Sequence, residues 1–86
     1  MEINFSNSSS DEITEFYKQI SSRIRKIREQ RGLSQLDLAL EIGIKSVAFY
    51  SNCENNRYNK HFNLEHIYKI SKALNLSLTE LLDFKD

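Results

Sequence analysis

The sequence predicts an all-α fold of five helices. Its 86 residues contain no proline and two glycines, Gly32 and Gly43, so most of the chain can be helical and breaks are few. Apolar residues make up 40% of the chain and recur at steps of three and four residues, the spacing of helices with one buried face. A chain of this length has room for one hydrophobic core.

The first predicted helix follows a polar segment. Residues 1–9 are rich in Ser and Asn, so we expect a mobile tail before a single domain over residues 10–86. Ser9 stands three residues before Glu12, which is capping-box spacing, and a helix is predicted over about 11–31, ending near Gly32. Its apolar stripe consists of Ile13, Phe16, Tyr17, Ile20, Ile24 and Ile27.

The next two predicted helices are short. Ser34 is an N-cap residue before a helix over about 35–42, and Asp37 in its first turn interacts favourably with the helix dipole. Gly43 ends this helix. A third helix is predicted over about 46–53.

A polar loop with several Asn residues separates the last two helices from the rest, and Asn tolerates left-handed backbone conformations. Asn63 caps a helix predicted over about 64–74. Its inward face is expected to carry Leu64, Ile67, Ser71 and Leu74. Ser77 begins a second capping box before a helix over about 78–83.

The net charge of zero hides an uneven distribution. Residues 1–22 carry one basic and four acidic side chains, residues 23–63 carry eight and four, and residues 64–86 carry three and four. The middle of the chain is therefore the part expected to face an anion.

Several kinds of protein are disfavoured. No apolar run approaches the roughly 20 residues that span a bilayer, and the N-terminus lacks a basic segment followed by an apolar one, so we expect a cytoplasmic protein with no membrane partner. A lone Cys53 reads as a small buried hydrophobe. No nucleophile, base and orienting group stand together, so no enzyme is predicted. His61 and His66 lack a thiol partner at zinc spacing, so we expect surface or capping histidines and neither metal nor cofactor.

The second and third helices have the features of a crossed pair. Such a pair needs a small residue where the helices cross and a residue able to adopt positive φ in the turn, and Ala39 and Gly43 meet these needs. The stretch IRKIREQRGLSQLDLALEIGI, followed by CE and HIYKISKALNLSLTELL, resembles the phage-repressor-like helix-turn-helix family, or Cro/XRE type, over about residues 22–82. The resemblance implies a lambda-repressor-like DNA-binding domain, here with an N-terminally extended first helix.

Individual positions carry the resemblance. They are Arg28 in the first helix, Ser34 and Gln35 opening the second, Leu38 and Ala39 within it, Gly43 and Ile44 at the turn, Cys53 and Glu54 ending the third, and Leu74, Leu81 and Leu82 in the last two. In this family the acid at the Glu54 position orients nearby backbone or a basic side chain, so we expect a structural role for it. Asn56 departs from the glycine that is usual there, and the turn is one residue longer.

The longer turn decides which side of the third helix faces inward. With the usual spacing, Phe49 and Asn52 would point into the core, whereas with one extra residue Tyr50 and Cys53 do so. A buried Asn without a partner costs about 1–3 kcal/mol, so we predict the longer turn, with Phe49 at the core edge against the following loop.

This register turns Ser46, Val47, Ala48, Ser51 and Asn52 outward. Methyl groups suit thymine methyls, Ser pairs with several bases, and Asn bonds adenine bidentately. The predicted DNA-binding set is completed by Arg28, Ser34, Gln35, Lys45, Asn55, Asn56, Arg57 and Lys60. Its cations would neutralise phosphates, and backbone amides at the start of the second helix would hold another. Further cations expected around the third helix lie on or just after the first helix, namely Arg25, Lys26, Arg28 and Arg31. For these a merely solvated face is the alternative.

The start of the first helix lies about two turns before the family domain usually begins. We predict that a homodimer contact buries its apolar residues Ile13, Phe16, Tyr17 and Ile20; the alternative is that they cover their own protomer.

The resemblance implies a sequence-specific double-stranded DNA-binding transcriptional regulator. We expect a repressor acting as a homodimer on an inverted repeat, with the third helix in the major groove. One alternative is an antitoxin-type interaction module that grips a toxin or another regulator; the nearly neutral third helix favours it and the basic middle segment disfavours it. A restriction-modification controller protein is the other.

Overall fold

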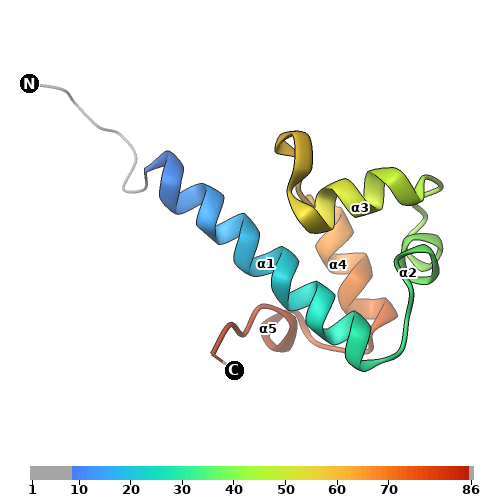
Figure 1. Ribbon diagram of the computed structural model, residues 1–86. Coiled ribbons are helices and arrows are strands. Elements are labelled where there is room, and N and C mark those ends of the chain that lie inside the picture. Colours follow the sequence, from blue (N-terminus) through green and yellow to red (C-terminus); the bar gives the residue numbers. More distant parts are fainter. Residues whose placement is uncertain (1–8, 86) are drawn as a thin grey trace, which may run out of the picture.

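The computed structural model describes residues 9–85, and this part of the chain forms five α-helices and one 3₁₀ turn without a strand (Figure 1). The elements are α1 (Ser10–Gln30), α2 (Gln35–Glu41), α3 (Val47–Asn55), η1 (Arg57–Asn59), α4 (Leu64–Ala73) and α5 (Leu78–Leu81). The all-α prediction with five helices is confirmed. The predicted tail lies outside the described residues except for Ser9, which caps α1.

Side-chain caps fix where the helices begin. The hydroxyl of Ser34 accepts from the backbone N–H of Asp37, and the Asp37 carboxylate accepts from the backbone N–H of Ser34. Ser77 and Glu80 form the same reciprocal pair at α5. Ser46 caps α3, so α3 begins one residue later than predicted. Each cap satisfies backbone donors that the first turn of a helix leaves without partners.

The core lies where α1, α2, α3 and α4 pack on one another, with α5 against α4. Ile24, Leu38, Tyr50 and Ile70 are fully buried in it. The first half of α1 extends beyond the other helices (Figure 1). The apolar stripe of α1 therefore packs in the shared core along the second half of the helix, and it lies on a more open surface along the first half.

The turn between α2 and α3 has the predicted chemistry. Ala39 is fully buried, and the backbone N–H of Ile44 donates to its carbonyl oxygen at 2.8 Å. Gly43 has φ +79°, and no atom lies within 4 Å of where its Cβ would be. Backbone conformation, and not lack of space, therefore requires glycine at this position.

The predicted register of α3 is confirmed. Tyr50 and Cys53 are fully buried, and Asn52 is half-buried. Phe49 lies at the edge of the core as expected, and its ring packs edge-on against His66 of α4, at 6.0 Å between centroids. The extra turn residue thus keeps the Asn52 amide out of the core.

The segment after α3 holds three residues in the left-handed region: Asn56 and Asn59, as expected of Asn, and Tyr58 with φ 56°. The left-handed conformation of Tyr58 was not predicted, because no residue pattern in the segment indicates it. Its side chain is 77% exposed.

One core expectation was wrong. Leu64 is 85% exposed at the start of α4, and the buried stripe of this helix begins at Ile67. Phe62, in the loop before α4, is buried instead, with its ring 5.3 Å from that of Tyr50. Because Phe62 fills the core at this end, Leu64 remains at the surface.

Candidate nucleic-acid interface

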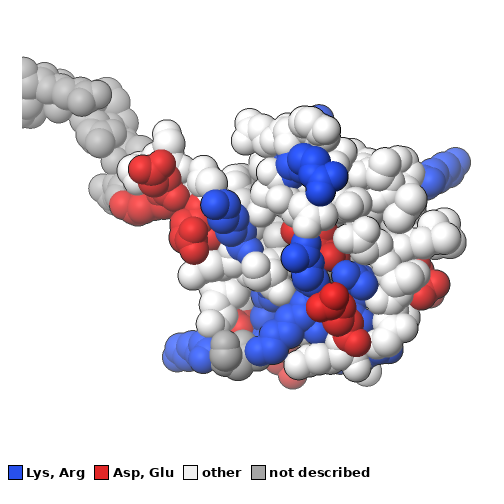
Figure 2. Space-filling model, in the orientation of Figure 1, with Lys and Arg blue, Asp and Glu red and all other residues white. Residues whose placement is uncertain are grey.

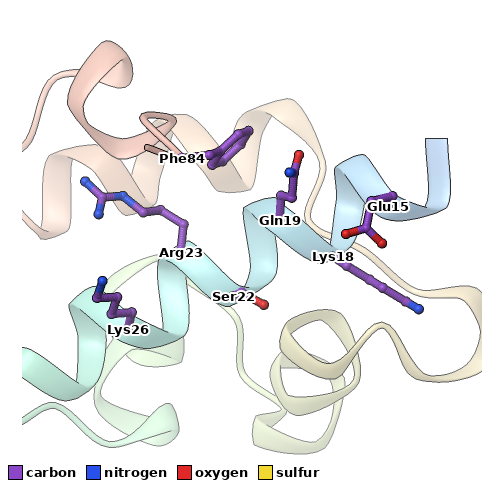
Figure 3. Close-up of a pocket in the computed structure, with 7 residues that line it drawn as sticks. All are labelled: Glu15, Lys18, Gln19, Ser22, Arg23, Lys26 and Phe84. Atoms are coloured by element: carbon purple, nitrogen blue, oxygen red, sulfur yellow. The ribbon is translucent and has the colours of Figure 1, made fainter. Parts of the chain in front are cut away.

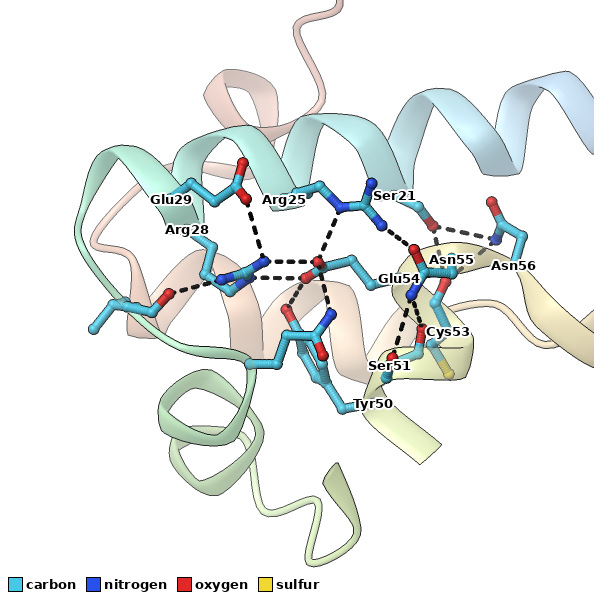
Figure 4. A network of polar contacts seen from close by, with 12 residues as sticks. Ser21, Arg25, Arg28, Glu29, Tyr50, Ser51, Cys53, Glu54, Asn55 and Asn56 are labelled. Atoms are coloured by element: carbon cyan, nitrogen blue, oxygen red, sulfur yellow. Dashed lines mark hydrogen bonds and ion pairs between the residues drawn. The ribbon is translucent and has the colours of Figure 1, made fainter. Parts of the chain in front are cut away.

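A buried carboxylate joins α1, α2 and α3 (Figure 4). Glu54, near the end of α3, has a fully buried side chain. Its Oε2 accepts from Tyr50 Oη at 2.6 Å and from Arg28 Nε at 3.0 Å. Its Oε1 accepts from Arg28 Nη2 at 2.9 Å, and from Gln35 Nε2 and Arg25 Nε at 3.2 Å each. One acid thus holds three helices together.

The hydrogen bonds set the charge state of this network. Burial by itself raises the pKa of the Glu54 carboxyl, but bonds from Arg28, Tyr50 and Gln35 outweigh it and lower that pKa below its usual value. Burial and the bond to Glu54 raise the pKa of Tyr50, so its hydroxyl stays protonated and donates. The same carboxylate raises the pKa of Arg28. The expectation that Glu54 orients a basic side chain is confirmed.

The prediction that Arg28 faces DNA needs correction. This residue is 8% exposed, and its Nη1 donates to the carbonyl oxygen of Leu33 at 2.7 Å while Nε and Nη2 donate to Glu54. A buried carboxylate is costly without a partner, and Arg28 is that partner. Its role in the fold is therefore to connect α1 with α3.

The beginning of α2 presents Ser34 and Gln35 at the surface. The Ser34 hydroxyl is engaged in capping α2, and Gln35 is half-buried. Because Gln35 donates from Nε2 to Glu54, the carboxamide is held in one orientation. The sequence placed Gln35 at this surface without showing that the acid of α3 would orient it.

The outward face of α3 carries small and polar groups. Val47 is 43% exposed, Ala48 is exposed, and Ser51 and Asn52 are half-buried. Ser46 is exposed just before this helix. The helix itself contains no lysine or arginine.

Asn55 is exposed and tied to its neighbours. Its Nδ2 donates to the carbonyl oxygen of Ser51 at 2.9 Å and to the Ser51 hydroxyl at 3.2 Å. Its Oδ1 accepts from Arg25 Nη2 (Figure 4). Asn55 thus reaches from α3 to a cation of α1.

Asn56, also in the predicted DNA-binding set, is half-buried, and its amide nitrogen is bonded within the chain. Its Nδ2 lies within hydrogen-bond distance of Ser21 Oγ at 3.2 Å and of the carbonyl oxygens of Cys53 and Lys60 at 3.3 Å each. Its left-handed φ of 52° explains how Asn stands where the family usually has glycine. The amide nitrogen closes the turn after α3.

Cations surround α3. Lys45 precedes it, Arg57 and Lys60 follow it, and all three are exposed. Figure 2 shows Lys and Arg side chains across the middle of the face formed by α1 and α3, and acidic side chains along the first turns of α1. Arg25, one of the cations expected on the first helix, joins them with its side chain 41% exposed.

The predicted dimer residues divide into two groups. Ile13 and Phe16 are exposed, and Tyr17 stacks on the ring of His61 at 3.8 Å between centroids. Ile20 is buried in the core of its own protomer, so the prediction that it contacts a partner was wrong. The register of α1 explains this, because Ile20 begins the part of the stripe that faces the bundle.

An apolar groove of about 630 Å³ runs beside these residues. It is lined by Phe16, Tyr17, Ile20, His61, Phe62, Asn63, Leu64, Ile67, Tyr68, Leu78 and Leu82. Four of these, Phe16, Leu64, Tyr68 and Leu78, are large hydrophobic side chains that remain exposed. Sequence reasoning found only the α1 side of this surface, since it assigned Leu64 to the core.

A second hollow, of about 230 Å³, lies between α1 and the C-terminal segment (Figure 3). It is lined by Glu15, Lys18, Gln19, Ser22, Arg23, Lys26 and Phe84. Arg23 donates from Nη2 to the carbonyl oxygen of Glu80 at 2.9 Å and from Nε to that of Leu81 at 3.3 Å. These bonds fasten the end of α5 to α1.

Two further observations concern residues 9–85. No three His, Cys, Asp or Glu side chains in this range come together as they would to hold a metal ion. None of the helices described has the length and apolar character needed to cross a membrane.

Comparison with known proteins agrees with this geometry. A family model described as helix-turn-helix matches residues 24–81. The chain is 41% identical over 68 residues to proteins named antitoxin HipB from Escherichia coli O6:H1 (strain CFT073) and from Escherichia coli K12. These matches cover 79% of this chain, and 68% and 73% of the two relatives. No solved structure matches.

Proposed function

The chain belongs to the helix-turn-helix family of the phage-repressor, or Cro/XRE, type, a family of DNA-binding regulators, and from this premise we propose a sequence-specific transcriptional repressor in the cytoplasm. The observation that carries this proposal is the outward face of α3, which presents Val47, Ala48 and Asn52 between exposed cations. In this arrangement α3 enters the major groove and meets base edges with methyl groups and an amide.

Phosphate contacts come from both ends of α3. Lys45 lies before the helix, and Arg57 and Lys60 lie after it. Arg25 adds a cation from α1 that Glu54 and Asn55 hold in place. Neutralising phosphates supplies much of the affinity independently of sequence, so α3 needs no cation of its own.

The buried network supports this function by fixing the reading helix. Glu54 bonds Arg28 of α1 and Gln35 of α2. Rotation of α3 about its axis would break these bonds and leave a buried carboxylate without partners. The orientation of Val47 and Asn52 relative to α2 is therefore set by the fold.

A homodimer on an inverted repeat completes the proposal. The groove beside α1 exposes Phe16, Leu64 and Leu78, and monomeric proteins rarely leave apolar patches of this kind uncovered. A second copy on this surface would bury them. Two-fold symmetry then places the two α3 helices in successive major grooves about 34–36 Å apart, and occlusion of a promoter gives repression.

A second candidate is an antitoxin whose main partner is a toxin. It is favoured by the similarity to proteins named antitoxin HipB and by the same apolar groove, which would then receive a partner protein. The two functions are compatible, because α3 and the groove use different residues. Neither the relatives nor the groove favours the restriction-modification controller.

Selection of bound sequences from random duplex DNA tests the repressor proposal. We expect an inverted repeat whose affinity falls steeply with salt, because several phosphates are neutralised. Asn52→Ala should weaken binding to the selected duplex without changing the melting temperature, and Gln19→Ala on α1 serves as the matched control. If no sequence is enriched even at low salt, the repressor proposal is wrong.

Sedimentation analysis tests the dimer separately. Leu64→Ser, in the groove, is expected to shift the protein toward monomer, whereas Leu40→Ser, at a residue of α2 that is 61% exposed and outside the groove, leaves the oligomeric state unchanged. A monomer in the unsubstituted protein would contradict the dimer and turn attention to a protein partner for the groove.

A further inference from the structure

The first turn of α3 presents an apolar surface to solvent. Val47 is 43% exposed and Ala48 is exposed, while the core takes Tyr50 and Cys53 from the same helix. Because the register of α3 is fixed by the buried Tyr50 and Cys53, these methyl groups point away from the bundle.

Most polar side chains on and near this face are already engaged. The Ser46 hydroxyl accepts from the backbone N–H of Phe49, and the Ser51 hydroxyl accepts from Asn55. The Asn55 carboxamide is bonded on both sides, to Ser51 and to Arg25. Of the predicted reading residues, Val47, Ala48 and Asn52 are the ones whose side chains no described hydrogen bond engages.

The helix α3 lacks the side chains that usually donate hydrogen bonds to guanine. Arg and Lys make the commonest contact to guanine O6 and N7, and this helix contains neither. Arg25 is held by Glu54 and Asn55 at the side of α3. Lys45 lies before the helix, outside its first turn.

The major-groove edge of a base pair has one apolar group that Val and Ala methyls can contact, the C5-methyl of thymine. We propose that α3 selects its operator through thymine C5-methyl groups that pack against Val47 and Ala48. This rests on the proposed function, and it assigns a chemical class of base to the first turn of the reading helix. The inference predicts thymine at the base pairs that Val47 and Ala48 contact. A merely electrostatic contact would accept any base at these positions.

The size of the effect follows from the burial of one methyl group. Removing a buried methyl(ene) group is expected to weaken binding about fourfold at each contacted thymine. A thymine that faces solvent or phosphate-binding residues gives no such change.

Replacement of thymine by uracil tests the inference directly. Deoxyuridine keeps the base pair and the O4 acceptor and removes only the methyl group. Each thymine of the selected duplex is replaced in turn, and the Kd is measured by fluorescence anisotropy at fixed salt. The expected result is a loss of about fourfold at one or two thymines in each half-site.

Protein variants connect the effect to its residues. Val47→Thr keeps the β-branched shape and exchanges one methyl for a hydroxyl, so the uracil penalty should shrink at one thymine. Ala48→Gly should reduce it at the other. Leu40→Ser, on the exposed face of α2, is the control that keeps every penalty.

The possible results separate this inference from the proposed function. If the protein binds a selected duplex and uracil costs nothing at any position, the thymine-methyl inference is overturned and the repressor proposal stands. If Val47→Thr keeps the full penalty at every thymine, the assignment to Val47 is overturned. If no duplex is bound, the proposed function fails and this inference fails with it.

Discussion

Arg28 and Glu54 form a buried ion pair, with Arg28 Nη2 2.9 Å from Glu54 Oε1, that joins α1 to α3 across 26 positions of sequence. Both side chains are almost entirely withdrawn from solvent, and Tyr50 and Gln35 complete the bonding of the carboxylate. A pair of this kind is expensive to disturb, because removal of one member leaves the other charged and buried.

Loss of the Glu54 carboxylate is expected to destabilise the fold. Glu54→Ala leaves the buried Arg28 guanidinium with only the exposed Glu29, 3.9 Å away, as an ion-pair partner, so the free energy of unfolding should fall by about 3–5 kcal/mol in urea denaturation. The exposed pair of Glu65 and Lys69, 2.8 Å apart, provides the control. Glu65→Ala should change the stability far less, because solvent screens an exposed pair. Equal losses in the two variants would contradict the structural role given to Glu54.

A carboxylate in place of the Gln35 amide would face Glu54. Gln35 Nε2 lies 3.2 Å from Glu54 Oε1, so Gln35→Glu replaces a hydrogen bond by repulsion between like charges. We expect a loss of about 1–3 kcal/mol at pH 7 that becomes smaller as the pH is lowered and one carboxylate is protonated. Gln19→Glu, at an exposed position of α1, is the matched control. Urea midpoints at pH 7 and pH 5 measure both; a loss that does not depend on pH would argue against repulsion.

His66 is expected to make stability fall in mild acid. Burial is the main cause that lowers the pKa of His66, and its Nδ1 accepts from the backbone N–H of Asn63 as the cap of α4. His66 therefore takes up a proton more readily in the unfolded chain than in the folded protein. The stability that neutral His66 contributes is complete above pH 6.5, its pKa in the unfolded chain. It is lost as the pH falls through the lower pKa of His66 in the folded protein. The hydrogen bond from the Asn63 backbone N–H to His66 Nδ1 is expected to contribute about 1 kcal/mol to the free energy of unfolding.

The measurement is urea denaturation at pH 7.5 and pH 5.5. His66→Gln should reduce the difference between the two. The assignment is wrong if His66→Gln leaves that difference unchanged.

Replacement of Tyr58 by glycine is expected to increase the stability of the fold. Its φ of 56° places a side chain in the left-handed region, which costs about 1–2 kcal/mol for residues other than glycine. Its exposed ring makes little use of the core. Tyr58→Gly is therefore expected to gain about 0.5–1 kcal/mol after the greater flexibility of the unfolded chain is included. Tyr68→Gly, inside α4, should instead lose about 1 kcal/mol, and thermal melting separates the two.

The parts of the fold that depend on neighbours in sequence were predictable. The caps at Ser34, Asn63 and Ser77 follow from the spacing of residues within one turn. Gly43 follows from the need for positive φ. The register of α3 followed from a single energetic comparison, the cost of burying Asn52 against that of burying Cys53.

The errors involve partners that are distant in sequence. Arg28 looked like a surface cation because its partner Glu54 lies on another helix. Ile20 and Leu64 were misplaced because the pattern of one helix does not show where its neighbours end. Of the candidate interface, the small outward residues of α3 could be predicted, but the bonds that hold Arg25 and Gln35 beside it could not.

The Glu54 network also determines how the protein would approach a ligand. Since α3 is locked to α1 and α2 through one fully bonded carboxylate, its outer face is preorganised before any encounter. Docking then proceeds as a rigid body, without the ordering entropy that accompanies coupled folding and binding. The heat-capacity change on binding should accordingly reflect only the surface buried between protein and DNA. Where the shapes of α3 and the major groove do not match, the DNA is expected to deform and the helix to keep its position.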